Sequence, residues 1–133
     1  MDSEVVAIIN SSPDTVDLIR IPLQRAGFTV LSGYTFDIRD GRFDVSAFVE
    51  RHRPRVLVYD VAPPYEENWR LFQHVRRLEV MRDCRFVITS VNPRHVEALA
   101  GRDERIYEVV GRPVDLDEIV NAVKEALKAR ATR

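Results

Sequence analysis

The sequence predicts an α/β fold, a doubly wound sandwich built on about five parallel strands. Three observations carry this prediction. Short continuous runs of β-branched and other apolar residues, such as 5–9 and 56–59, are typical of strands buried on both faces of a parallel sheet. Segments with apolar residues at helical spacing separate these runs. Glycine, proline and small polar residues mark the boundaries between the two kinds of segment.

The strands are expected where the apolar runs fall, and each run ends in polar residues or a turn signal. In chain order, the expected strands are 5–9, 28–31, 56–59, 86–88 and 107–110. The stretch 32–43, which contains Gly33 and the pair Asp40-Gly41, predicts a polar loop or short turn.

The first expected helix has a clear beginning and end. Ser12 is a good N-cap, Pro13 suits the first helical position, and Asp14 is favourable near the positive end of a helix. Gly27 stops the segment. A short helix is expected to begin at Val45 and to end near Arg53.

Three further helices follow from apolar spacing. Trp69, Phe72 and Val75 predict a helix after Pro63-Pro64, with Trp69 in the core, and 93–100 predicts another that Gly101 ends. In the last helix Asp115 and Glu118 resemble a capping box. Its expected inward stripe consists of Leu116, Ile119, Val120, Val123 and Leu127.

Length and composition restrict the class of protein. The 133 residues fit one domain, and 20 Lys and Arg against 21 Asp and Glu argue against a generally basic nucleic-acid binder. No apolar stretch approaches the roughly 20 residues of a membrane span, and the acidic N-terminus does not resemble a signal peptide. The single cysteine, Cys84, forms no internal disulfide and is expected to be a buried or half-buried thiol. We therefore expect a cytoplasmic protein with no membrane association.

Candidate functional residues lie at the carboxyl ends of the strands, where ligands bind in open parallel sheets. These residues are Asn10, Ser11, Asp60, Thr89, Ser90 and Arg112. A carboxylate, a hydroxyl and a cation converging there suit a phosphoryl group, which they would receive, hydrogen-bond and neutralise.

The same residues carry a resemblance to a known family. Residues 56–64 combine an apolar strand, Asp60 and Pro64, residues 86–90 place Thr89 at the end of a strand, and Arg112-Pro113 precedes the last helix. In order and spacing these motifs resemble the receiver domain of bacterial two-component response regulators over essentially the whole chain. The resemblance implies a flavodoxin-like sheet of order 2-1-3-4-5 and a single receiver-like domain spanning 1–133 without an output domain.

The resemblance also implies roles for individual residues. Asp60 would be the phosphoacceptor, Thr89 the conformational switch that contacts the phosphoryl group, and Arg112 would stand in the place of the family's lysine. A histidine kinase or phosphotransfer protein would supply the phosphoryl group, and a downstream effector protein would receive the signal. The chain would then be a non-enzymatic phosphoprotein, and a homodimer through the last two helices is one expected arrangement.

The chain departs from the family at the metal site. Asn10 and Ser11 replace the acidic pair that helps to hold Mg²⁺, and Val109 falls where an aromatic switch residue is usual. Asp60, the carbonyl of Ala62 and Asn10 remain as ligands for weak or absent Mg²⁺ binding. Arg112 opposite Asp60 would form a pair without metal, so we expect a pocket biased towards a metal-free, unphosphorylated state.

Several alternatives remain open from the sequence. Asn10, Ser11 and Ser12 also suit an ordinary turn with a helix cap. The chain could be a phosphorylation-independent interaction scaffold, a pseudo-receiver, or, as a lesser alternative, a small flavodoxin-like cofactor binder for a flavin or nucleotide, although the first loop lacks phosphate-binding glycines. The arginines of 70–85 are interpreted as solvated helix faces.

Overall fold

The computed structural model describes residues 4–101, 105–111 and 115–129. Five parallel strands form one sheet in the order β2-β1-β3-β4-β5, which confirms the predicted topology. The strands are β1 (Val5–Asn10), β2 (Thr29–Tyr34), β3 (Val56–Asp60), β4 (Arg85–Ser90) and β5 (Ile106–Gly111). The helices are α1 (Pro13–Arg25), α2 (Thr35–Arg39), α3 (Val45–His52), α4 (Tyr65–Arg76), the 3₁₀ turn η1 (Glu79–Met81), α5 (Pro93–Ala100) and α6 (Leu116–Ala129).

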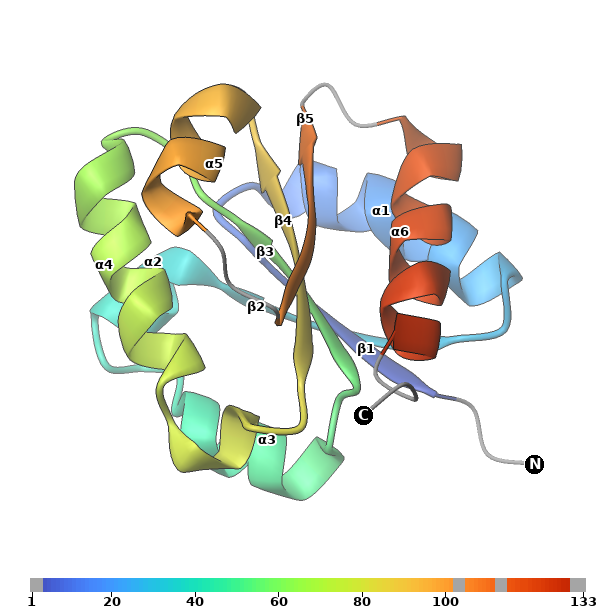
Figure 1. Ribbon diagram of the computed structural model, residues 1–133. Helices are drawn as coiled ribbons and strands as arrows, with labels where there is room; N and C mark the ends of the chain where they lie inside the picture. Colours follow the sequence, from blue (N-terminus) through green and yellow to red (C-terminus); the bar gives the residue numbers. More distant parts are fainter. Residues whose placement is uncertain (1–3, 102–104, 112–114, 130–133) are drawn as a thin grey trace.

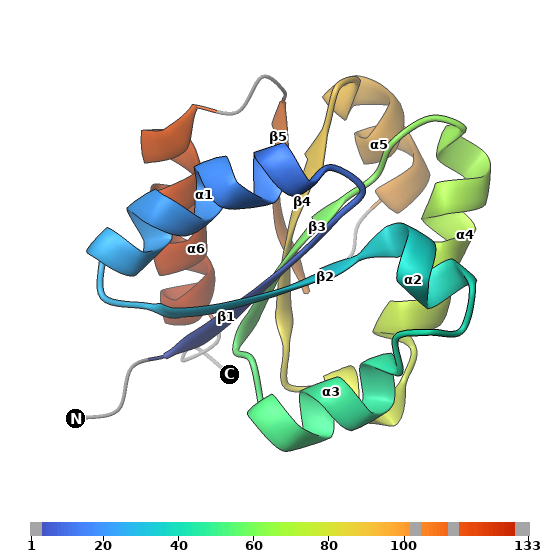
Figure 2. The same ribbon diagram turned by 180° about the vertical axis from the view of Figure 1, so that it is seen from behind.

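Helices cover both faces of the sheet. Helices α1 and α6 lie on one face, and α2, α3, α4 and α5 lie on the other (Figures 1 and 2). Alternate residues of each central strand enter the two cores, so that Val58 packs towards α1 and α6 while Leu57 and Tyr59 pack towards α3 and α4. Burial on both faces explains why these strands are continuous apolar runs in the sequence.

Most predicted helix ends are found in the structure. The Ser12 side chain accepts a hydrogen bond from the backbone N–H of Thr15, with Pro13 at the first helical position. Gly101 ends α5, and the Asp115 carboxylate accepts hydrogen bonds from the backbone N–H groups of Asp117 and Glu118. Trp69 and Cys84 are buried, as expected.

The prediction of a loop over 32–43 is wrong for residues 32–39. Strand β2 continues to Tyr34, because Ser32 and Gly33 pair with β1, and α2 follows directly. A Cβ atom on Gly33 would lie 2.6 Å from the ring of Phe43, so glycine here allows a close approach rather than a turn. The polar residues and Gly33 led to the prediction of a loop, whereas the segment is a strand that the Phe43 ring covers.

The predicted inward stripe of the last helix needs one correction. Leu116 is exposed, whereas Ile119 and Val123 are fully buried. Ala122 and Ala126, which the pattern did not single out, are buried beside them. Leu116 lies at the first position of α6, where the helix has not yet reached the sheet core. Among the described residues, no helix is both long and apolar enough to cross a membrane.

Candidate functional site

Asp60 and Thr89 meet at the carboxyl edge of the sheet. They end β3 and β4 and are register partners in the parallel ladder. The Thr89 hydroxyl donates a hydrogen bond of 2.6 Å to Oδ1 of Asp60, and both side chains are buried. A hydrogen bond from a hydroxyl to a carboxylate is among the stronger kinds, so it holds the two predicted site residues together.

Asn10 closes the loop that follows β1. It is buried, and its Oδ1 accepts a hydrogen bond of 3.0 Å from the backbone N–H of Ser12. Ser12 in turn caps α1. The turn-and-cap interpretation of this segment is therefore confirmed, while Ser11 is exposed and faces the cavity described below.

Two residues that the sequence did not indicate, on α4 and α2, lie beside the loop that follows β3. The side-chain amide of Asn68, on the first turn of α4, donates a hydrogen bond of 2.7 Å to the carbonyl of Ala62. Arg39, at the end of α2, donates to Oδ1 of Asn68. Asn68 has a weak signal in the sequence, since the first turn of a helix after a strand end faces that end. Arg39 has none, because it was expected in a loop.

These residues surround a small open cavity of about 130 Å³ beside Asp60. Its wall includes Ser11, Thr35, Arg39, Tyr59, Asp60, Ala62 and Asn68. Among these lining residues Arg39 is exposed, whereas Tyr59 and Asp60 are buried. A cation and a carboxylate therefore line one cavity from two different elements.

Tyr59 is an unusual member of this wall. Its ring packs on Phe72 at a centroid distance of 4.9 Å, and its buried hydroxyl has no hydrogen-bond partner among the described residues. Burial raises the pKa of this phenol well above its ordinary value; the Arg39 charge opposes that rise and the Asp60 charge adds to it. The hydroxyl thus remains protonated and lies within the electrostatic reach of both charged residues.

Two of the residues singled out in the sequence, Arg112 and Val109, have no described contact with Asp60. Arg112 lies outside the described residues, although the pairing of Ser90 with Gly111 brings the end of β5 beside β4. Val109 is half-buried in β5, and the nearby Tyr107 is exposed. In the described part of β5, no aromatic residue therefore fills the position of the family's aromatic switch residue.

A divalent cation at this edge would have to compete with hydrogen-bond donors for the oxygen atoms. Oδ1 of Asp60, Oδ1 of Asn10 and the carbonyl of Ala62 each already accept a hydrogen bond. The described residues contain no group of three or more His, Cys, Asp and Glu side chains placed to hold a metal. The Arg39 guanidinium on the cavity wall repels a second cation. Mg²⁺ in proteins is usually held by one or two carboxylates and several waters, and Asp60 is the one carboxylate among the residues that line this cavity.

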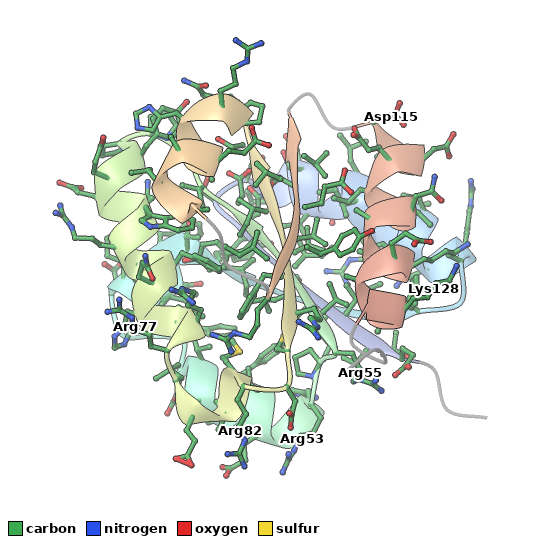
Figure 3. All side chains as sticks on the ribbon, in the orientation of Figure 1. Arg53, Arg55, Arg77, Arg82, Asp115 and Lys128 are labelled. Carbon is green, nitrogen blue, oxygen red and sulfur yellow. The ribbon has the colours of Figure 1, made fainter. Side chains whose placement is uncertain are left out.

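The arginines of the middle segment lie away from this site. Figure 3 shows Arg53 and Arg82 at the end of the molecule opposite Asp115, which follows the carboxyl end of β5. Arg70, Arg77 and Arg82 are exposed, in agreement with their interpretation as solvated residues, whereas Arg76 is half-buried and Arg85 is half-buried at the start of β4 rather than on a helix. The carboxyl ends of the helices gather at that end of a doubly wound fold, so cations there complement the helix dipoles.

Comparison with known proteins gives few relatives in sequence and many in structure. No family model matches the chain. A protein of Leptolyngbya boryana described as an uncharacterized 14.6 kDa protein in the sodA1 3′ region is 24% identical over 120 residues, covering 90% of this chain and 87% of that protein.

The similar solved structures cover almost the whole chain. They include a sensor protein from Polaromonas sp. JS666 with a TM-score of 0.75 and 18% identity, covering 97% of this chain and 99% of that one. A response regulator from Thermotoga maritima gives a TM-score of 0.71 and 18% identity, covering 96% and 99%. The chemotaxis response regulator CheY4 of Vibrio cholerae gives 0.69 and 16%, covering 95% and 100%.

Fold and neighbours together define the class of structure. The chain has the flavodoxin-like fold with strand order 2-1-3-4-5. Its structural neighbours are mostly CheY-like response-regulator receiver domains.

Proposed function

We propose that this chain is a signalling receiver that acts through protein–protein contacts and does not require metal-dependent phosphorylation. The observation that carries the proposal is the Arg39–Asn68–Ala62 chain of hydrogen bonds, which occupies the carbonyl that a metal would need. Together with Asn10 in place of an acidic residue, the Arg39 charge weakens the electrostatic attraction of the pocket for Mg²⁺ and leaves Asp60 as the one carboxylate on its wall. The module would be non-enzymatic and cytoplasmic, and its partner would be an effector protein.

A second candidate function is that of a phosphorelay receiver. The buried Asp60 carboxylate with the Thr89 hydroxyl 2.6 Å away favours this candidate, because it matches a phosphoacceptor beside a switch residue. A histidine kinase or phosphotransfer protein would then be the donor. A flavin- or nucleotide-binding role has less support, since the cavity beside Asp60 measures only about 130 Å³.

Incubation with acetyl phosphate, with and without Mg²⁺, separates the two candidates. Intact-protein mass spectrometry should show no phosphoryl adduct on the wild-type chain in either condition. An adduct that requires Mg²⁺ and is absent from Asp60→Asn would contradict our proposal and establish the phosphorelay receiver.

A spectroscopic measurement gives an independent readout. Trp69 is the single tryptophan, it is buried in α4, and it follows Asn68 directly. We expect Mg²⁺ with beryllofluoride to leave its fluorescence unchanged. A saturable change that Asp60→Asn abolishes would show that the pocket still accepts a metal and a phosphoryl mimic.

A further inference from the structure

A second cavity lies at the edge of the sheet opposite Asp60, where β3 and β4 begin. Its volume is about 250 Å³, and its lining comes from the end of α3, the start of β3, η1 and the residues that follow η1. The apolar part of the lining consists of three buried residues, Val49, Pro54 and Cys84, and the half-buried Val80. Pockets for small molecules usually measure about 300–1,000 Å³, so this cavity suits a single apolar side chain better than a free ligand.

Arginines flank this apolar lining. Arg53 and Arg55 line the cavity, and so does Asp83, which directly follows Arg82. Figure 3 shows Arg53 and Arg82 at the same end of the molecule. Arg55 forms an ion pair with Glu4 at 3.0 Å. Arg53 and Arg82 are exposed, and neither has a carboxylate partner among the residues that the structure describes. Two guanidinium groups beside the cavity are therefore available to anionic side chains.

The backbone at Arg53 is an unusual place for an arginine. Arg53 directly follows α3 with φ 52° and ψ 53°, the left-handed conformation in which glycine is the usual residue. Its Nε donates a hydrogen bond to the carbonyl of Glu50, and its two terminal nitrogens have no hydrogen-bond partner in the described part of the chain. Backbone strain of this kind clusters at functional positions, so it points to a role for the guanidinium.

Exposed acidic residues determine the kind of partner. Glu50, Glu79 and Asp83 are exposed, and each lies within three positions of Arg53 or Arg82 in the sequence. A nucleic acid presents an unbroken row of phosphates, which these carboxylates would repel. A protein segment can place a carboxylate against each arginine and an uncharged residue against Asp83. Among the described residues, the exposed large apolar side chains lie on other elements, so this edge has no anchor for a membrane.

We propose that this cavity docks an acidic segment of a partner protein, which inserts one apolar side chain and places carboxylates against Arg53 and Arg82. An apolar anchor in a pocket with charged contacts around it is typical of protein interfaces. The inference rests on the proposed function and deepens it, because it gives the chemistry of the effector and places its contact at the edge opposite Asp60. Docking there needs no change at Asp60, in agreement with a module that signals without phosphorylation.

The first test is binding of a defined peptide to the intact chain. Fluorescence anisotropy with a fluorescein-labelled peptide of glutamates around one central phenylalanine should show saturable binding at low ionic strength. The same peptide with alanine at its centre should bind about tenfold more weakly, because an inserted anchor carries much of the binding energy. Absence of binding, equal affinity for the two peptides, or tighter binding of a short DNA duplex overturns the proposal.

Charge variants locate the contact. Arg82→Glu should weaken binding of the phenylalanine peptide by about fivefold, whereas Arg94→Glu, the same change of net charge on an exposed arginine of α5, should leave it unchanged. Arg53→Gly should also weaken binding, yet its midpoint of thermal unfolding should equal or exceed that of the wild type, since glycine adopts the left-handed conformation without strain. Wild-type affinity in both Arg82→Glu and Arg53→Gly would locate the peptide elsewhere and overturn the assignment.

A neutral variant tests the cavity itself. Val80→Gln replaces an apolar lining residue without changing the charge, so the advantage of the phenylalanine peptide over the alanine peptide should disappear. That advantage should persist in Val91→Gln, which alters an exposed valine outside the cavity. Its persistence in Val80→Gln contradicts the insertion. None of these measurements involves Mg²⁺ or acetyl phosphate, so failure here leaves the proposed function standing, whereas a Mg²⁺-dependent adduct on Asp60 contradicts that function separately.

Discussion

Arg39 donates a hydrogen bond to the side-chain oxygen of Asn68, and so joins the short helix α2 to the first turn of α4. The amide nitrogen of the same Asn68 binds the Ala62 carbonyl in the loop after β3. One asparagine therefore uses both ends of its amide to fix the loop that follows Asp60. A neutral donor, Asn68, contacts this loop directly, and a cationic donor, Arg39, holds Asn68 in turn.

Asn68→Ala should destabilise the protein by about 1–2 kcal/mol, because it leaves the part-buried Ala62 carbonyl without its donor. Urea unfolding followed by Trp69 fluorescence measures the change. Gln73→Ala is the matched control in the same helix, since it removes a comparable amide whose oxygen accepts a hydrogen bond from Arg76. That control should cost less than about 0.5 kcal/mol. Equal effects would show that the Ala62 contact contributes nothing specific.

Thr89→Val should cost about 1–3 kcal/mol, because it removes the donor to a buried carboxylate while keeping the shape of the side chain. Thr29→Val is the matched control, since Thr29 is exposed at the start of β2. Chemical unfolding of both variants checks the prediction. If the two variants are equally stable, Asp60 does not depend on the Thr89 hydroxyl.

Gly33→Ala should destabilise the fold by about 1–3 kcal/mol through overpacking, because the added Cβ would lie 2.6 Å from the Phe43 ring. The double variant Gly33→Ala with Phe43→Leu tests the cause. It should be more stable than the sum of the two single changes predicts, as measured by thermal or urea unfolding. Simple additivity would mean that the Phe43 ring moves aside without cost.

Glu108→Gln should stabilise the protein at neutral pH. Partial burial raises the pKa of Glu108, and the negative charge of Glu118 raises it further. A carboxyl whose pKa is higher in the folded state favours folding when protonated, and that contribution is lost as the pH rises through the folded-state pKa. The advantage of the glutamine variant should therefore shrink as the pH falls towards the ordinary pKa of glutamate.

Unfolding curves measured from acidic to neutral pH test this dependence. Glu118→Gln, which removes only the neighbouring charge, should give a smaller stabilisation of the same sign, because burial is the larger cause. A glutamine effect that is constant across the pH range would contradict the electrostatic origin.

The pattern of the strands made much of the fold predictable. Runs such as Val56–Asp60 are buried on both faces, and only a parallel sheet covered by helices on both sides gives every residue of a strand that environment. The caps at Ser12 and Asp115 are local features, so the sequence alone shows them. The end of β2 was missed because Gly33 is held by a ring ten residues further along the chain.

Some residues of the candidate site were also predictable from the sequence, and others were not. Asp60 and Thr89 were predictable because they end neighbouring apolar runs, and parallel strands bring their carboxyl ends to one edge. Arg39 and Asn68 were not predictable from the sequence, because their hydrogen bond joins two helices through residues that are 29 positions apart. No local periodicity encodes a contact of that kind.

The sequence by itself determined the class of fold, the strand-end residues and the loss of the acidic pair, because each depends on short-range pattern and residue type. Only the tertiary structure decided which other side chains surround Asp60. The hydrogen bond between α2 and α4 places Arg39 on the wall of the Asp60 cavity, and the core between the sheet and α4 buries the Tyr59 side chain. The cation beside Asp60 is thus placed by long-range packing, which no short-range pattern in the sequence encodes.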